Sequence, residues 1–174
     1  LLCKEADLAP SLVITPEEDD ITAMLKLVND ARRPLVLLGG LVTREAAWKA
    51  LPVFERVGIP VATTTSAIDR VHTSSQVFAG RPGTWGGQRA GNLVLAQADV
   101  ILAFGVQLDL QQTGFNYLEY APQAQLIHVF PSRIELNRVG PPAAIKVSNS
   151  LQTLTLPCAW PTLMSLTHTP LRMG

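Results

Sequence analysis

The chain contains several short, uninterrupted apolar segments, separated by longer stretches in which polar and apolar residues mix. These segments show no alternation of apolar and polar positions, which is typical of strands that are buried on both faces of a parallel sheet. They therefore predict five or six parallel strands. The segments are residues 35–38, 59–62, 77–79, 100–104 and 126–130, and more weakly 144–147.

Helix signals lie between most of these strands. Thr15, Pro16 and Glu18 supply an N-cap, a first helical residue and the partner of a capping box, so a first helix is expected to start there. Thr43 and Gly58 have the residue types that begin and end a second helix, as N-cap and left-handed terminator.

Later helix signals are weaker. Pro52 lies inside the second helix and is expected to bend or shorten it, because proline lacks the N–H that the helix needs. A third helix is expected over residues 87–98, and shorter ones are expected after Thr113 and after Ser132. Strand and helix thus alternate, and right-handed crossovers then predict a Rossmann-like, doubly wound α/β sheet with helices on both faces.

The chain divides into three parts on this pattern. Residues 1–14 have the character of a linker or arm, residues 15–147 carry the α/β pattern, and residues 148–174 form an atypical C-terminal tail. The tail has no clear period, and Arg172 is its one charged residue. It is interpreted either as an apolar tail that lies on a neighbour or as a segment that leads into more protein or is not native coding sequence.

Composition narrows the classes of protein. The chain has 174 residues, with 14 Lys and Arg against 14 Asp and Glu. A neutral chain lacks the basic surface that nucleic acid or an anionic membrane attracts, and no apolar run is long enough to span a membrane. Cys3 and Cys158 form neither a disulfide framework nor a metal motif. We expect a cytoplasmic domain without nucleic-acid or membrane partners.

Candidate binding residues follow the predicted strands. In open α/β sheets, ligands bind outside the carboxyl ends of the strands. The loops at those ends are residues 39–40, 63–66, 105–109 and 131–132. Gly39, Gly40 and Gly105 allow close approach of a backbone to a ligand, although tight turns would need glycine as well. Neither glycine-containing loop reads G-x-G-x-x-G and no acidic residue ends the second strand, which disfavours an NAD-dependent dehydrogenase.

A second candidate is the segment 80–92, in which five glycines accompany Trp85 and two arginines. So many glycines indicate that the backbone of this segment passes close to a neighbouring group. That partner is either a ligand lined by this loop or another domain packed against it, and the residues leave both interpretations open.

The chain shows no catalytic constellation. Its carboxylates are scattered, and His72, His128 and His168 lack the spacing of metal ligands, so we predict neither catalytic residues nor a metal site in this chain. His128 lies in the middle of a predicted strand and is expected to be a hydrogen-bonded core histidine. By its own residues the chain is a binding scaffold.

A set of short motifs nevertheless resembles a known family, the central domain of thiamine-diphosphate-dependent enzymes, and acetolactate synthase and its relatives in particular. The resemblance covers roughly residues 17–147. The motifs are Gly83-Thr84-Trp85, Gln88-Arg89-Ala90-Gly91-Asn92, Ala98-Asp99, Gly105, Gln112-Thr113-Gly114-Phe115-Asn116 and His128-Val129, with Arg33-Pro34-Leu35-Val36, Gly39-Gly40 and Gly58-Ile59-Pro60-Val61-Ala62-Thr63-Thr64 at the first two strands.

This resemblance implies an enzyme of three α/β domains that joins or decarboxylates 2-keto acids with thiamine diphosphate and magnesium. The first domain supplies a catalytic glutamate, and the third carries a Gly-Asp-Gly motif that does not occur in these 174 residues. The central domain holds FAD in acetolactate synthase, and ADP or nothing in some relatives. The implied partners are the N- and C-terminal domains of the parent enzyme, within a homo-oligomer.

The resemblance also implies a set of cofactor-binding positions, in which an FAD or ADP molecule would contact residues of the strand-end loops. At Gln107 and Gln111 the FAD-binding relatives have arginine, and at Phe130 they have aspartate, so directional, charge-assisted bonds are lost here. The carried-over positions are Gly39, Gly40, Thr64, Thr65, Gly83, Thr84, Gly105, Gln107 and Asp109.

Two functions from different classes follow. In the first, the chain is the central domain of a thiamine-diphosphate-dependent enzyme, structural and inter-domain in role and not catalytic alone. In the second, it is a stand-alone module that binds FAD or ADP. A third possibility, an NAD-consuming deacylase of similar fold, would need a Cys-x-x-Cys zinc pair that the sequence lacks.

Overall fold

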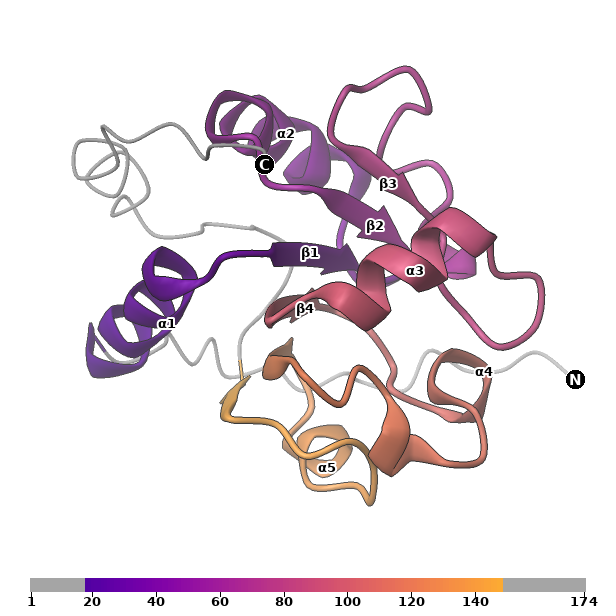
Figure 1. Cartoon of the computed structure of the whole chain (residues 1–174). Coiled ribbons are helices and arrows are strands. Elements are labelled where there is room, and N and C mark those ends of the chain that lie inside the picture. The colour runs from indigo at the N-terminus through magenta and orange to yellow at the C-terminus, as the bar shows by residue number, and fades with distance from the viewer. Residues whose placement is uncertain (1–17, 149–174) are drawn as a thin grey trace, which may run out of the picture.

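Six strands form one parallel sheet in the order β3-β2-β1-β4-β5-β6 (Figure 1). The computed structural model describes residues 18–148. Each of the six strands overlaps a predicted apolar segment, which confirms the parallel sheet. The strands are β1 (Pro34–Leu38), β2 (Val61–Thr63), β3 (Phe78–Gly80), β4 (Val100–Phe104), β5 (Gln125–Phe130) and β6 (Ile145–Ser148).

α-Helices or 3₁₀ turns lie between successive strands, and one further α-helix precedes the first strand. The longer ones are α1 (Glu18–Asp30), α2 (Arg44–Val57) and α3 (Arg89–Gln97). Two short α-helices, α4 (Leu110–Thr113) and α5 (Arg133–Leu136), and two 3₁₀ turns, η1 (Thr65–Ala67) and η2 (Tyr117–Glu119), complete the described chain. No helix in the range 18–148 has the length and apolar character needed to cross a bilayer.

The sheet is covered on both faces, as predicted for a doubly wound fold. Alternate residues of β1 divide between two apolar cores: Val36 and Leu38 pack with Phe54 of α2, whereas Leu35 and Leu37 pack with Leu95 of α3. α1 joins the first core, and α3 crosses in front of the sheet in Figure 1. Because both faces are buried, the strands need apolar residues at every position, which explains the uninterrupted apolar segments.

The strand order reverses between β1 and β4, which are hydrogen-bonded neighbours with Leu38 opposite Phe104. β1 leads through α2 to β2 on one side, and β4 leads through α4 to β5 on the other. The loops that leave such a pair at their carboxyl ends diverge toward opposite halves of the sheet, and open α/β proteins bind ligands at this point.

The second helix has its predicted ends, and it is not shortened at Pro52. Thr43 caps α2 by accepting a hydrogen bond from the Ala46 N–H, and Gly58 ends it with φ of 72°. The helix runs through Pro52 and has 14 residues in all, from Arg44 to Val57, so the expected shortening is wrong, and the alternative of a bend stays a prediction. Phe54, fully buried two residues later, fixes the last turn against the sheet, and this packing outweighs one missing hydrogen bond.

The short helix near Thr113 lies before that residue and not after it. Asp109 caps α4, which ends at Thr113, and the following segment contains only the 3₁₀ turn η2. The short helix expected after Ser132 is present as α5, and the third helix spans residues 89–97 in place of 87–98. Thr15, Pro16, the arm 1–14 and nearly all of the tail 148–174 lie outside the described residues.

Candidate functional site

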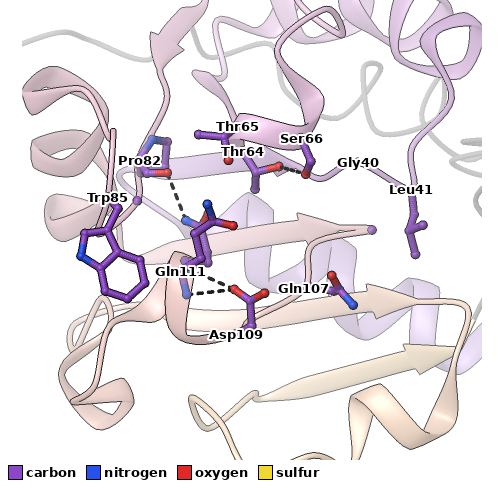
Figure 2. Close-up of a pocket in the computed structure, with 13 residues that line it drawn as sticks. Gly40, Leu41, Thr64, Thr65, Ser66, Pro82, Trp85, Gln107, Asp109 and Gln111 are labelled. Carbon is purple, nitrogen blue, oxygen red and sulfur yellow. Dashed lines mark hydrogen bonds between the residues drawn. The ribbon is translucent and has the colours of Figure 1, made fainter.

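A pocket of about 240 Å³ lies at the carboxyl edge of the sheet, between the loops that follow β1, β2, β3 and β4 (Figure 2). Thr64, Thr65 and Ser66 lie along one side of it, and Gln107, Asp109 and Gln111 lie along the other. The full set of lining residues is Gly40, Leu41, Thr64, Thr65, Ser66, Pro82, Gly83, Trp85, Gly105, Gln107, Asp109, Gln111 and Gln112.

The loops after β1 and β4 touch each other at the base of the pocket. The Gly39 N–H donates to the Phe104 carbonyl oxygen at 2.8 Å, and the Leu41 N–H donates to the Gly105 carbonyl oxygen at 3.4 Å. A Cβ atom on Gly39 would lie 2.0 Å from the Gly105 carbonyl oxygen, which no side chain can tolerate. Contact between the two loops therefore accounts for glycine at position 39.

Arg70 holds the β1–α2 loop from the side of η1. Its guanidinium donates to the carbonyl oxygens of Gly40 and Val42 and pairs with the carboxylate of Asp69. Asp69 also pairs with Arg44 in the first turn of α2, and this hydrogen bond is the main cause that lowers the Asp69 carboxyl pKa. Charged side chains that do not line the pocket, those of Arg70, Asp69 and Arg44, thus stabilise the conformation of this loop.

The β2–η1 loop contributes hydroxyl groups. The Thr64 N–H donates to the Leu38 carbonyl oxygen at 2.9 Å, which extends the β1–β2 ladder by one bond. The hydroxyl oxygens of Thr64 and Ser66 lie 3.0 Å apart and share a hydrogen bond. Both side chains reach the pocket, so this wall can donate and accept hydrogen bonds but carries no charge.

Asp109 is both a pocket residue and the N-cap of α4. Its Oδ1 accepts from the backbone N–H groups of Gln111 and Gln112 at 3.1 and 3.2 Å. Gln112 is buried, and its Nε2 donates to the Pro82 carbonyl oxygen at 3.4 Å and to the Tyr120 hydroxyl at 3.3 Å. Burial raises the pKa of the Tyr120 phenol well above its usual range. This network joins the β3–α3 loop to the chain after β4.

The glycine-rich segment folds mainly on itself. The Gly83 N–H donates to the Asn92 side-chain oxygen at 2.9 Å, and the Gln88 N–H donates to the Arg81 carbonyl oxygen at 2.7 Å. A Cβ on Gly87 would lie 2.2 Å from the Gly83 carbonyl oxygen. Close contacts within the loop therefore require at least part of its glycine content, and Pro82, Gly83 and Trp85 face the pocket.

His128 is a hydrogen-bonded core residue, as predicted. Its Nε2 lies 2.9 Å from the Val106 carbonyl oxygen and the side chain is buried. Burial is the largest cause that lowers the imidazole pKa, and the positive charges of Lys146 and Arg138 lower it further. The contact fixes the loop that carries Gln107 and Asp109 into the pocket.

The structure brings most of the predicted binding residues together. Gly40, Thr64, Thr65, Gly83, Gly105, Gln107 and Asp109 all line the pocket. Gly39 lies behind it against Gly105, and the Thr84 side chain packs near Gly114.

The sequence prediction missed several lining residues, among them Leu41, Trp85 and Gln112. Trp85 belongs to the glycine-rich segment 80–92, and a tryptophan among glycines in that segment could have indicated a pocket residue. Gln112 begins one of the family motifs, which was its signal, whereas Leu41 offered none.

Charge in the pocket is limited to one carboxylate. Of the described residues that line it, Asp109 alone is charged. Throughout residues 18–148, no three His, Cys, Asp or Glu side chains gather closely enough to hold a metal ion. The pocket wall can therefore form hydrogen bonds, and its one charge would repel anions.

Comparison with known proteins places this architecture in a family. Residues 21–156 match the profile of the "Thiamine pyrophosphate enzyme, central domain" family. The chain is 32% identical over 128 residues to the acetolactate synthase large subunit of Corynebacterium glutamicum and 35% identical over 126 residues to acetolactate synthase of Mycobacterium leprae. It is also 32% identical over 128 residues to sulfoacetaldehyde acetyltransferase of Rhodobacter capsulatus.

These alignments cover most of this chain and a small part of each relative. They include 73%, 71% and 71% of this chain, respectively, but only 20%, 20% and 22% of the three relatives. The chain therefore spans about a fifth of the length of the curated relatives that it matches.

Proposed function

The chain belongs to the family of thiamine pyrophosphate enzyme central domains, and from this premise we propose that it acts as the middle domain of an acetolactate-synthase-like enzyme. Its role there is structural and inter-domain, and it is not catalytic alone. The parent activity is carboligation or decarboxylation of a 2-keto acid, in line with relatives that are named for acetolactate synthesis.

The observation that carries the inter-domain role is the unusual exposure of large apolar side chains on one part of the chain. Phe115, Leu118, Ile134 and Val139 are 82%, 63%, 87% and 77% exposed. Phe115 follows α4, Leu118 lies in η2, Ile134 lies in α5 and Val139 follows α5, and α4 and α5 both lie in the lower half of Figure 1. Large exposed apolar patches mark surfaces that other protein covers. The N- and C-terminal domains of the parent, or further copies of it in a homo-oligomer, are the proposed cover.

Thiamine diphosphate and magnesium do not fit the described residues. Magnesium needs a cluster of oxygen ligands, and residues 18–148 gather no such group. The Gly-Asp-Gly motif that the family resemblance implies for this purpose is not in the sequence. The proposed central domain therefore leaves the main cofactor to the other domains.

FAD or ADP fits the pocket only in part. The hydroxyl and amide groups of Thr64, Thr65 and Gln107 suit the hydroxyls of a ribose or ribityl chain. The diphosphate of either molecule would meet the Asp109 carboxylate and no cation among the described lining residues. The stand-alone FAD or ADP module is therefore the weaker of the two functions.

An activity measurement tests the main proposal. Purified chain, supplied with thiamine diphosphate, magnesium and pyruvate, is expected to release no carbon dioxide and form no acetolactate above a blank. The matched positive control is an intact acetolactate synthase in the same assay. Turnover by the chain alone would overturn the non-catalytic role. In the source DNA, a glutamate-bearing domain encoded upstream and Gly-Asp-Gly encoded downstream are expected; flanking DNA that encodes unrelated proteins would contradict the middle-domain role.

A further inference from the structure

We propose that the pocket at the carboxyl edge binds a neutral, polyhydroxylated ring, such as a monosaccharide or the ribose of an unphosphorylated nucleoside, and discriminates against diphosphates. The inference concerns the pocket itself and does not depend on the catalytic or inter-domain role of the chain. It rests on five features: the charge of the walls, the use of the nearby backbone N–H groups, the hydrogen-bonding side chains, the exposed indole of Trp85 and the volume of the pocket.

The charge of the pocket opposes anions. Tight binding of a diphosphate commonly relies on arginine or lysine, or on free N–H groups at a helix start. Among the described residues of the wall there is no arginine, lysine or histidine, and Asp109 contributes a negative charge. The Asp109 Oδ1 is held by two backbone N–H groups, so the carboxylate is fixed in place. A phosphate in this pocket would be repelled.

Several backbone N–H groups next to the pocket already have acceptors within the protein. In the β1–α2 loop, the N–H groups of Gly39, Leu41 and Val42 all donate to carbonyl oxygens within the protein, at 2.8, 3.4 and 3.1 Å. In the first turn of α2, the Ala46 N–H is taken by the Thr43 hydroxyl. The turn that cradles phosphates in dinucleotide-binding folds is here bonded to the β4 loop.

The polar side chains suit hydroxyl groups. Thr64, Thr65 and Ser66 offer hydroxyls that both donate and accept, and Gln107 and Gln111 offer amides with the same versatility. They lie on opposite walls (Figure 2), so a ring between them can be bonded from both sides. The Asp109 carboxylate can accept hydrogen bonds from a hydroxyl group, whereas it would repel a phosphate.

Trp85 supplies an apolar wall of the right kind. Its indole lines the pocket while remaining 53% exposed, and it meets Phe115 edge to face, with ring centroids 6.4 Å apart. The face of an aromatic ring is electron-rich, so it attracts the C–H bonds on the apolar side of a sugar ring. Hydroxyl-binding side chains with an aromatic ring beside them form a site for a polyol.

The size of the pocket agrees with a single ring. Its volume of about 240 Å³ lies below the range of about 300–1,000 Å³ that is usual for drug-sized ligands. A dinucleotide would extend well beyond this space. A monosaccharide or one nucleoside sugar is the ligand class that the volume, charge and wall chemistry favour together.

Fluorescence of a variant with Trp85 as its sole tryptophan tests the proposal. Trp48→Phe and Trp160→Phe together remove the other two tryptophans. D-glucose, D-ribose, adenosine and ADP are the probes. We expect the Trp85 fluorescence to change saturably with at least one neutral probe at millimolar concentration. ADP should bind at least about fivefold more weakly than adenosine. Tighter binding of glucose or ribose than of adenosine would identify the ligand as a free sugar, and tighter binding of adenosine would identify it as a nucleoside.

Two matched variants make the test independent of folding. Asp109→Asn keeps an N-cap residue, since asparagine caps as well as aspartate, and is expected to strengthen ADP binding about fivefold without strengthening adenosine binding. Glu119→Gln, which removes a carboxylate that does not line the pocket, should change neither. The proposal fails if no neutral probe saturates the signal, if ADP binds as well as adenosine, or if Asp109→Asn leaves their ratio unchanged.

Discussion

The Nε2 atom of His128 lies 2.9 Å from the carbonyl oxygen of Val106. Through this contact a buried residue in the middle of β5 fixes the loop after β4, and with it Gln107 and Asp109 at the pocket wall. The geometry of the pocket therefore depends on a buried side chain that does not line it.

Replacing His128 should lower stability and change its pH dependence. His128→Phe leaves the buried Val106 carbonyl without its donor, at an expected cost of about 1–3 kcal/mol. Urea unfolding followed by circular dichroism at neutral pH measures this cost. Wild-type stability within experimental error would show that the contact contributes nothing.

The pH dependence of the same pair has a definite sign. Burial lowers the imidazole pKa in the folded state, so between that value and about 6.5 the unfolded chain binds more protons. The His128 contribution is complete above about pH 6.5 and is lost as the pH falls through 6.5 toward the folded-state pKa. The free energy of unfolding should fall more between pH 7.5 and 5.5 in the wild type than in His128→Phe, and equal losses would contradict the assignment.

Replacement by alanine should affect stability very differently at two glycines among the predicted site residues. Gly39→Ala places a Cβ 2.0 Å from the Gly105 carbonyl oxygen, and forcing the two loops apart should cost about 2 kcal/mol or more. Gly83→Ala brings its Cβ no nearer than 3.7 Å to the Gln111 carbonyl oxygen, so its effect should stay within about 0.5 kcal/mol. Thermal unfolding of both variants measures the difference, and similar melting temperatures would refute the loop contact.

The cap of α4 can be separated from the charge of Asp109. Asp109→Ala removes the acceptor for the Gln111 and Gln112 N–H groups and should destabilise the protein by about 1 kcal/mol. Asp109→Asn should be nearly neutral, because asparagine keeps an acceptor there. Chemical denaturation curves of the two variants provide the comparison, and equal stability of both would argue against capping.

The exposed apolar side chains near α5 should affect association and not folding. Ile134→Ser, at a side chain that is 87% exposed, should change the free energy of unfolding by less than about 0.5 kcal/mol. It should also reduce binding of a hydrophobic dye and self-association in sedimentation. As a control, Ile127→Ser in the core, where exposure is 0%, should unfold the chain. A large stability loss from Ile134→Ser would contradict the proposed contact surface.

The fold was predictable because the strand signal is local. Val100–Phe104 and Leu126–Phe130 read as buried strands from their own composition, since a sheet covered on both faces needs apolar residues at every position. The order of the strands was not predicted, because it depends on which face each crossover helix covers. Pro52 shows the same limit: its local preference for ending a helix is overcome by burial of Phe54.

The clustering of the candidate site residues at one edge of the sheet was predictable for a related reason. Residues such as Thr64, Gly105 and Asp109 follow strands, and the carboxyl ends of parallel strands meet at one edge. Local sequence does not distinguish a glycine that lets a ligand approach from one that lets another loop approach, as at Gly39. Nor does it show that Gln112 reaches across to Pro82.

Arg70 gives the pocket a kinetic property. Because its guanidinium bonds to the carbonyl oxygens of Gly40 and Val42, the β1–α2 loop is ordered by contacts within the chain and needs no ligand to set its conformation. Association should then proceed in one step without a slow closing phase, and amide exchange at Gly39, Leu41 and Val42, whose N–H groups are bonded, should be slow before a ligand is added and nearly unchanged afterwards. The edge of the sheet would behave as a rigid receptor and not as a gate.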